Sequence, residues 1–132
     1  MKRDFFVDTS AWYAFLNASD PACAAVREAV AAARRIVTTN YVVDETITLA
    51  LMRSGHRAAV RIGEILRDPA EVETFWVDPE VEQEAWALFA ARPDKVYSFT
   101  DCTSFVSMRR LGLGTALATD PDFKREGFEV VP

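Results

Sequence analysis

The chain has 132 residues, of which 50% are hydrophobic, and a formal net charge of −5 at pH 7. This length fits one domain spanning residues 1–132 with a hydrophobic core of its own, and the composition excludes an intrinsically disordered chain. The acidic charge argues against a general nucleic-acid-binding protein with a basic surface. It does not exclude an enzyme that gathers carboxylates around cations.

The sequence also predicts the cellular compartment. The apolar run at residues 5–7 is too short for the core of a signal peptide. No segment reaches the ~18 consecutive apolar residues of a membrane span. The two cysteines, Cys23 and Cys102, lie far apart without metal-ligand spacing. We therefore expect a cytoplasmic protein that does not bind membranes and keeps both thiols reduced.

The first half of the chain alternates short apolar runs with segments of helical periodicity. Asp8, Thr9 and Ser10 follow the first run directly and are residue types that cap helices. Asn40 is the expected cap of a later helix, and Gly55 is expected to break that helix. In chain order we predict a strand at 5–7, helices at 11–16 and 21–33, a strand at 35–38, and helices at 40–52 and 56–67.

The second half continues this alternation. Pro79 is expected to open a helix, Thr100 to cap the next one and Gly112 to end it. Strands that alternate with helices predict an α/β fold with a parallel sheet of about five strands. We predict a strand at 72–77, helices at 79–91 and 100–111, a strand at 115–118, a helical turn at 121–125 and a strand at 128–131.

Four acidic residues follow predicted strands or begin the helices after them. Asp8 directly follows the first strand, and Asp120 lies just past the strand at 115–118. Glu45 lies in the first turns of the helix after the second strand, and Asp101 lies at a helix start. Ligands of parallel sheets bind beyond the carboxyl ends of the strands, so we expect these side chains at one edge. Like charges there need a counter-charge, and carboxylates without a Cys/His set favour Mg²⁺ or Mn²⁺ over zinc.

Each of these acids alone also fits a structural role, as a helix cap or as an anion at a helix start. Two neighbouring acids compete for the same site. Asp44 lies about 100° around the helix from Glu45, so both cannot face one ion equally, and we expect Asp44 to face solvent. Asp122 competes with Asp120 for the position of the fourth acid.

In their order along the chain, these acidic segments resemble the motifs of PIN-domain nucleases, especially the bacterial VapC-like toxins. The opening motif resembles residues 6–10, FVDTS, and the second motif resembles residues 38–45, TTNYVVDE. The third motif resembles residues 98–102, SFTDC, and the closing motif resembles residues 118–123, ATDPDF, with Gly-Phe at 127–128. The resemblance covers essentially the whole chain and rests on four motifs in order.

The resemblance implies a three-layer α/β/α sandwich and a metal-dependent endoribonuclease. It places the catalytic and metal-binding acids of the family on Asp8, Glu45, Asp101 and Asp120, because a phenylalanine three residues after Asp120 favours it over Asp122. The resemblance also implies a homodimer and a small VapB-like antitoxin that inhibits the enzyme. This chain would then be the toxin of a toxin–antitoxin pair.

The resulting hypothesis assigns a role to each acid. Asp8 and Asp101 would bind one Mg²⁺ or Mn²⁺ directly, and Glu45 would act through the metal or a water that it holds. Asp120 would complete the acidic pocket. The cation would lower the pKa of the water that attacks the phosphodiester of the RNA.

Other residues near these acids admit two interpretations. Thr9 or Ser10 could orient water or phosphate, although a helix cap is the simpler explanation of each. Aromatic residues could stack on bases, but their helix and strand spacing favours the core. Trp12 and Phe15 are also candidates for lining an antitoxin groove. The aromatic residues concerned are Trp12, Phe15, Phe75, Trp76, Trp86 and Phe89.

An arginine stripe is the clearest basic feature of the sequence. Arg53, Arg57 and Arg61 are spaced four residues apart, which predicts that they share one helix face. A solvated helix surface is the simplest interpretation. Contact with the RNA backbone or with an antitoxin is the functional alternative.

Three other functions compete with the nuclease. A haloacid-dehalogenase-like phosphatase would use Asp8 as a nucleophile and need a second aspartate where Ser10 stands. A receiver-like phospho-acceptor would need a lysine near the last strands, and Lys124 lies in the wrong place. A non-catalytic PIN-like module that binds RNA or protein is the third alternative. The complete set of acids disfavours it, because degenerate members usually lose one or more of them.

Overall fold

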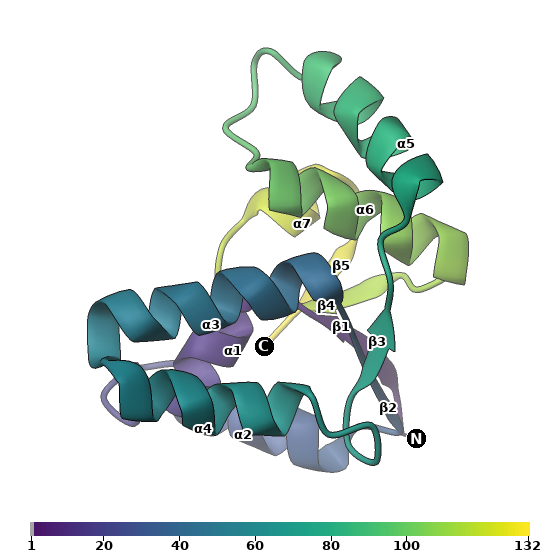
Figure 1. Cartoon of the computed structure of the whole chain (residues 1–132). Coiled ribbons are helices and arrows are strands. Elements are labelled where there is room, and N and C mark those ends of the chain that lie inside the picture. The colour runs from purple at the N-terminus through teal and green to yellow at the C-terminus, as the bar shows by residue number, and fades with distance from the viewer. Residues whose placement is uncertain (1) are drawn as a thin grey trace.

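Over residues 2–132, the part of the chain that the structure describes, the computed structural model has a five-stranded sheet whose neighbouring strands are all parallel. The strand order is β3-β2-β1-β4-β5, so the chain begins in the centre of the sheet, builds one half and then crosses back to build the other (Figure 1). This confirms the predicted α/β fold. The strands are β1 (Asp4–Val7), β2 (Arg35–Thr39), β3 (Glu73–Phe75), β4 (Thr115–Leu117) and β5 (Glu129–Val131).

The central strand is β1, and its last three residues are apolar and buried on both faces. Phe6 and Val7 are fully buried, and Phe6 pairs with Val37 of β2 on one side and with Ala116 of β4 on the other. Helices cover both faces of a parallel sheet, so a run of consecutive apolar residues suits its centre. The run ends at Asp8, which places that carboxylate at the carboxyl end of the central strand.

The edge strand β3 is shorter than the predicted strand at 72–77. It pairs only with β2, and the last pair joins Thr39 to Phe75. Two residues later the backbone N–H of Val77 donates to the side-chain oxygen of Asn40 at 2.7 Å, and not to a neighbouring strand. The chain therefore leaves the sheet after Phe75 and turns toward the next helix.

Seven helices connect the strands within residues 2–132. Their ends agree with the predicted ones to within two residues, with α2 beginning at Cys23 and not at Pro21. The helices are α1 (Thr9–Leu16), α2 (Cys23–Ala32), α3 (Asn40–Ser54), α4 (His56–Leu66), α5 (Pro79–Ala90), α6 (Phe99–Leu111) and α7 (Asp122–Arg125).

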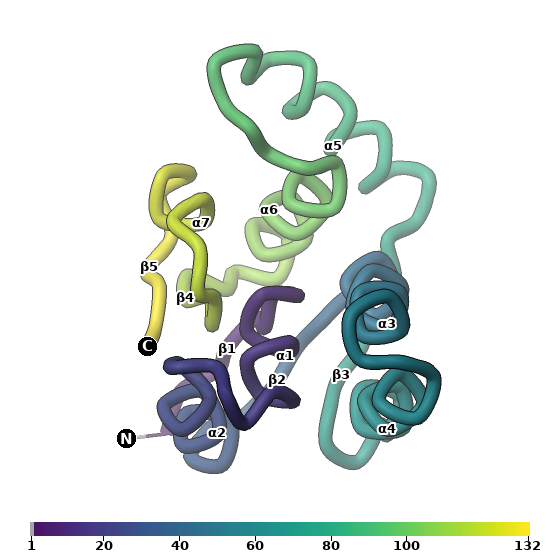
Figure 2. The backbone as a smooth tube through the Cα atoms, turned by 90° about the vertical axis from the view of Figure 1, so that its left-hand side faces the viewer, coloured from purple at the N-terminus to yellow at the C-terminus, as the bar shows by residue number. Residues whose placement is uncertain are grey.

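The helices form a layer on each side of the sheet (Figures 1 and 2). The connections from β1 to β2 and β3 run in one direction across the sheet, and those to β4 and β5 run in the other. Right-handed crossovers therefore place α2 and α4 on one face and α6 and α7 on the opposite face. Helix α3 contacts α1, α4 and α6, and so joins the two layers, while α5 packs on the outside of α6. This is the expected α/β/α sandwich.

Two predicted helix caps are wrong by one or two residues. The cap of α3 is Thr39, whose hydroxyl accepts a hydrogen bond from Val42 N at 3.1 Å. Asn40, the predicted cap, is already helical and instead binds the strand-to-helix linker through Val77. The cap of α6 is Ser98 and not Thr100, because the Ser98 hydroxyl accepts from the third helical N–H.

The spacing of the aromatic residues favoured a place in the core for them, but only some of them lie there. Trp12 is buried, and Phe15 and Phe75 are partly buried. Trp76, Trp86 and Phe89, however, are 68%, 57% and 40% exposed. Trp76 is exposed because it follows the edge strand. Trp86 and Phe89 are exposed because they lie on α5, which packs mainly against α6 and leaves its other side open.

The arginine stripe is also interrupted. Gly55 has a φ of 92° and separates α3 from α4, so Arg53 lies in the last turn of one helix while Arg57 and Arg61 belong to the next. The three side chains are exposed, but they do not form one helix face. Arg53 lies over the ring of Tyr13, 5.2 Å from its centroid.

Two further expectations concern the compartment. Both cysteines, Cys23 and Cys102, are buried and unpaired, as expected of reduced thiols. None of the helices within residues 2–132 combines the length and the apolar character that crossing a membrane requires.

The turn at Gly55 generates a prediction about stability. Gly55→Ala should lower the free energy of unfolding by about 1–2 kcal/mol, because a Cβ atom is disfavoured at positive φ. The matched control is Gly114→Ala, where an added Cβ meets open space and φ is not positive. It should leave stability unchanged or raise it by up to about 1 kcal/mol. Urea unfolding followed by circular dichroism measures both, and equal losses in the two variants would contradict the assignment.

Candidate metal centre

The four predicted acids come together at the carboxyl-terminal edge of the sheet. Asp8 directly follows β1, and Asp120 lies three residues past the end of β4. Glu45 lies in the second turn of α3, which begins where β2 ends, and Asp101 lies in the first turn of α6. Because β1, β2 and β4 are adjacent and parallel, the segments that follow them leave the sheet at the same edge.

Asp8 is the most constrained of these acids. Its side chain is 3% exposed, and Oδ2 accepts hydrogen bonds from the backbone N–H of Ser10 at 3.1 Å and from its hydroxyl at 2.7 Å. The other oxygen, Oδ1, is buried and has no hydrogen-bond partner among residues 2–132. An unpaired buried carboxylate oxygen is costly, and a cation is the partner that suits its charge. The unpaired Oδ1 of Asp8 is therefore an atom that fits one ligand position of a cation.

Ser10 links two of the acidic segments. Its hydroxyl oxygen donates to Asp8 and accepts a hydrogen bond from the backbone N–H of Thr119 at 3.0 Å. Thr119 immediately precedes Asp120, so Ser10 fixes the orientation of one acid and the loop that carries the other. Sequence reasoning gave Ser10 the simpler role of a helix cap, but Asp8 itself caps α1. The sequence signal for this contact is the spacing of Asp8 and Ser10, because a serine two residues after an aspartate can donate hydrogen bonds back to its carboxylate.

Asp101 has two roles at the start of α6. Its carboxylate accepts from the backbone N–H of Ser98 at 3.0 Å, and the Ser98 hydroxyl accepts from the N–H of Asp101 at 3.0 Å. This reciprocal pair is a capping box, which holds the carboxylate at the helix N-terminus. The structural role anticipated for this acid is thus present, and the same hydrogen bond holds the side chain at the acidic edge.

The two neighbouring competitors are placed differently. Asp44 is exposed, as predicted, whereas Glu45 is half-buried. Asp122 pairs with Arg125 at 3.0 Å in the short helix α7, and its backbone N–H donates to Asp120 at 3.0 Å.

Burial and mutual repulsion shift the acidity of two of these groups. Burial, the largest cause, raises the pKa of Asp8 to about 7; the Ser10 hydroxyl opposes this shift, and the charges of Asp101 and Asp120 add to it. Burial likewise raises the pKa of Asp101 to about 6, although the hydrogen bond from Ser98 N lowers it.

The charges that act on Asp101 show how far the acidic cluster extends. They come from Asp120, Asp122 and Glu45, all of which raise its pKa. The acids are thus close enough to repel one another. Within residues 2–132, however, no three His, Cys, Asp or Glu side chains converge at the spacing that would hold a metal ion. The carboxylates share an edge without forming a closed coordination shell, and their metal-binding role stays a prediction.

The donor set indicates the kind of cation. All of the candidate ligands are carboxylate oxygens, which suit hard cations that keep part of their water shell. The only histidine, His56, lies at the start of α4, and both cysteines are buried outside this set of acids. A cation held by these side chains would therefore be a hard, oxygen-liganded one.

The parallel sheet and its acidic edge place the chain in a known class of α/β nucleases. Residues 5–129 match the PIN domain, and the chain belongs to the PIN-domain family. Two relatives from Mycobacterium tuberculosis, strains CDC 1551 / Oshkosh and ATCC 25618 / H37Rv, are each named 23S rRNA-specific endonuclease VapC20. Each is 41% identical over 129 residues, which cover 96% of this chain and 98% of the relative. The chain is thus an endonuclease of the VapC type.

A solved structure agrees with this assignment. The crystal structure of Mycobacterium tuberculosis VapC20, described as a sarcin–ricin loop cleaving toxin, superposes with a TM-score of 0.91 and 39% sequence identity. The match covers 98% of this chain and 100% of that chain. Agreement at this level over almost the whole length of both chains confirms that the chain has a PIN fold.

The raised pKa values generate a prediction about the metal-free protein. Asp8 and Asp101 keep their protons to about pH 7 and about pH 6 when folded, against the ordinary value of 3.8. Between about pH 4 and pH 7 the folded chain therefore binds more protons than the unfolded chain, and its free energy of unfolding falls as pH rises. Asp8→Asn should remove most of this fall and raise stability near pH 7.5 by roughly 2–4 kcal/mol.

The measurement is urea unfolding in a chelator at about pH 5 and about pH 7.5. Asp44→Asn is the control, because Asp44 is an exposed acid on α3 next to Glu45. It should keep the pH dependence of the wild type. A wild-type protein that is equally stable at both pH values would show that the carboxylates are not buried together.

Proposed function

We propose that this chain is a divalent-metal-dependent endoribonuclease that cleaves 23S rRNA at the sarcin–ricin loop, and that it is the toxin of a toxin–antitoxin pair. The observation that carries the catalytic part is Asp8, a buried carboxylate with one unpaired oxygen at an edge shared with three other acids. The RNA target is supported by the VapC20 relatives, which match almost the whole chain.

The metal site would be formed by the four acids at the edge. Asp8 and Asp101 would bind the cation directly, and Glu45 and Asp120 would complete its surroundings. A bound Mg²⁺ or Mn²⁺ would supply a Lewis acid that lowers the pKa of water and offsets charge on the phosphodiester. Because the pKa values of Asp8 and Asp101 are raised, cation binding near neutral pH displaces protons from these two side chains.

The other contacts at the edge position these groups. Ser10 holds one oxygen of Asp8, so that the second oxygen remains available as a ligand. Ser98 fixes the carboxylate of Asp101 at the start of α6. Without a counter-charge the acids would repel an RNA phosphate, so the same residues that bind the cation also keep the substrate away until the cation is present.

The remaining assignments concern partners and compartment. We propose a single domain over residues 1–132 that acts in the cytoplasm as a homodimer. We also propose a small VapB-like antitoxin as the protein partner. The support for these assignments is the match to VapC20, which covers both chains almost completely.

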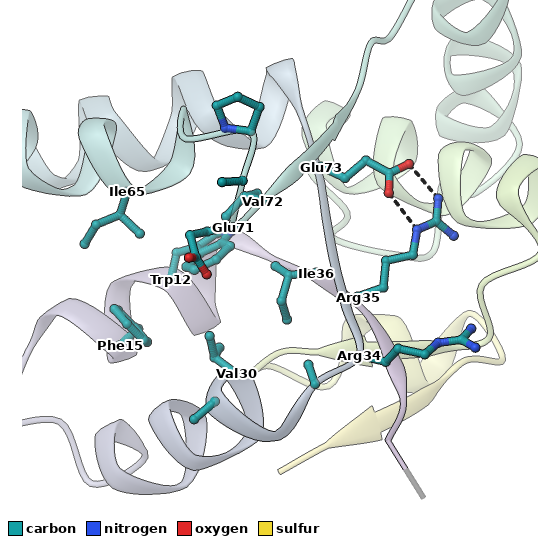
Figure 3. Close-up of a pocket in the computed structure, with 14 residues that line it drawn as sticks. Trp12, Phe15, Val30, Arg34, Arg35, Ile36, Ile65, Glu71, Val72 and Glu73 are labelled. Atoms are coloured by element: carbon teal, nitrogen blue, oxygen red, sulfur yellow. Dashed lines mark hydrogen bonds and ion pairs between the residues drawn. The ribbon is translucent and has the colours of Figure 1, made fainter.

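A pocket between α1, α2 and α4 supports the antitoxin assignment (Figure 3). It has a volume of about 490 Å³, and Trp12, Phe15 and Ile65 line it; the first two are the residues proposed to line an antitoxin groove. The indole N–H of Trp12 is buried and has no acceptor among residues 2–132. The ion pair between Arg35 and Glu73 lies at its rim. Arg34 and Glu71 also line the pocket, so a segment that carries both apolar and charged side chains fits this lining.

The catalytic assignment predicts the outcome of an RNA cleavage assay. The purified chain should cut RNA that contains the sarcin–ricin loop when Mg²⁺ or Mn²⁺ is added, and not in a chelator. Asp8→Asn and Asp101→Asn should each lower the rate by more than about 100-fold, since even changes outside the ligand shell cost roughly 10- to 100-fold. Asp44→Asn should retain activity because Asp44 faces solvent.

Full activity in a chelator, or in Asp8→Asn that is free of other nucleases, would contradict the mechanism. No cleavage of any RNA, together with no metal binding by calorimetry, would favour the non-catalytic binding module instead. Cleavage of other RNA with the sarcin–ricin loop left intact would retain the enzyme and change its target.

A second assay decides which residue is the fourth acid. Asp120→Asn should lower cleavage more than Asp122→Asn does, because the charge of Asp120 acts on both Asp8 and Asp101. The Asp122 carboxylate instead pairs with Arg125. We expect a loss of about 10-fold or more for Asp120→Asn and of about threefold or less for Asp122→Asn. The reverse order, measured at saturating Mg²⁺, would move the assignment to Asp122.

A further inference from the structure

Four aromatic rings form a continuous row that begins on the outer helix α5 and ends beside the acidic edge. We call this row the aromatic ladder; its members are Trp86, Phe89, Phe99 and Tyr41. Trp86 and Phe89 are stacked, with centroids 5.9 Å apart and planes at 22°. Both rings pack against Phe99, with ring centroids 6.4 Å and 6.2 Å from its own. The centroids of Phe99 and Tyr41 are 6.2 Å apart.

The inner end of the ladder adjoins two of the four acids. Phe99 is the first residue of α6 and lies two residues before Asp101. Tyr41 lies on α3 four residues before Glu45, so the two side chains occupy the same side of that helix one turn apart. The ladder therefore runs from solvent to the edge at which the phosphodiester would bind.

The outer end of the ladder is open to solvent. Trp86 and Phe89 are 57% and 40% exposed, whereas Phe99 and Tyr41 are half-buried. Two stacked rings that face solvent on a helix are a surface for another flat apolar group. Unpaired bases of RNA loops are recognised by stacking on such rings, and stacking tolerates any base because each has a π-face.

The charges near the ladder favour a base over the RNA backbone. Glu82 accepts a hydrogen bond from the Tyr41 hydroxyl, and Glu80 and Glu84 pair with Arg110 of α6. Carboxylates on α5 repel phosphates but not a neutral base. The surface thus suits a base turned out of its strand, with the phosphates directed away from α5.

The exposed area is small for a protein partner. Trp and Phe side chains offer on the order of 150–250 Å² each, so the exposed parts of Trp86 and Phe89 give about 200 Å². A stable interface between two proteins buries about 800 Å² on each partner. An unpaired base is closer to the size of this surface than a second copy of the chain is.

We propose that Trp86 and Phe89 stack on an unpaired base of the RNA substrate and position the neighbouring phosphodiester at the acidic edge. This inference rests on the proposed endoribonuclease activity and names the part of the substrate that this surface recognises. It makes Trp86 and Phe89 positioning residues that distinguish a loop from a duplex.

The test compares a hairpin RNA that carries the sarcin–ricin loop with a fully paired duplex of the same length. Trp86→Ala should raise KM for the hairpin by about 5- to 100-fold, the cost of losing one stacked base, while kcat changes by less than about threefold. Trp86→Phe, which keeps a flat ring, should restore most of the loss. Trp76→Ala is the matched control, because Trp76 is at least as exposed as Trp86 but lies outside the ladder.

Binding is measured separately from cleavage. In an Asp8→Asn background, the affinity for the hairpin should fall with Trp86→Ala by a similar factor, and the affinity for the duplex should not. Circular dichroism checks that each variant is folded, which we expect because Trp86 projects from the outer helix.

Three results would overturn the proposal. If Trp86→Ala leaves KM and the affinity for the hairpin unchanged, base stacking is overturned, while the proposed nuclease activity is retained. An equal loss of affinity for the hairpin and the duplex would mean that Trp86 does not recognise an unpaired base. A change of oligomeric state by light scattering, with cleavage per dimer unchanged, would make the ladder an interface between two copies. Loss of metal-dependent cleavage by the wild type is a separate failure that concerns the nuclease itself.

Discussion

A carboxylate buried at the end of the central strand constrains much of this structure. The Asp8 side chain is nearly inaccessible, yet one of its oxygens is left without a partner among the described residues. That position exists because β1 is covered on both faces and flanked by β2 and β4. The crossing back of the chain after β3 is what brings β4 beside β1, and with it the loop that carries Asp120. The topology of the sheet therefore determines which acids can meet.

The same side chains stabilise helix starts and form the acidic edge. Asp8 caps α1, and Asp101 belongs to the capping box of α6. Each carboxylate thus uses one set of hydrogen bonds to begin a helix. Burial is the main cause of its raised pKa, and the charges of the neighbouring acids add to the shift. Burial and like charge make the edge unfavourable without a cation, a combination that is common where a protein holds a functional group in an unstable environment.

Sequence reasoning predicted the features that depend on strand ends. Apolar runs marked the strands, and the acids after them could be assigned to one edge because parallel strands end together. The details that it missed depend on tertiary contacts. Asn40 has the right chemistry for a cap, but its side chain binds Val77, which is distant in sequence. Ser98 and Thr100 are both residue types that cap helices, and the observed start of α6 decides between them. The exposure of Trp86 and Phe89 follows from the single-sided packing of α5, which the periodicity of that segment does not reveal.

The helix α1 connects the pocket in Figure 3 with the acidic edge over a single turn. The backbone N–H of Trp12 donates to the carbonyl of Asp8 at 3.0 Å, so the residue that lines the pocket is bonded to the residue that carries the buried carboxylate. A ligand that displaced Trp12 would also displace the turn that Asp8 caps. Linkage is reciprocal, so a cation that ordered this turn would change the affinity of the pocket by the same factor. A partner seated there would thus act on the enzyme by energetic coupling, without reaching the edge proposed to bind the metal.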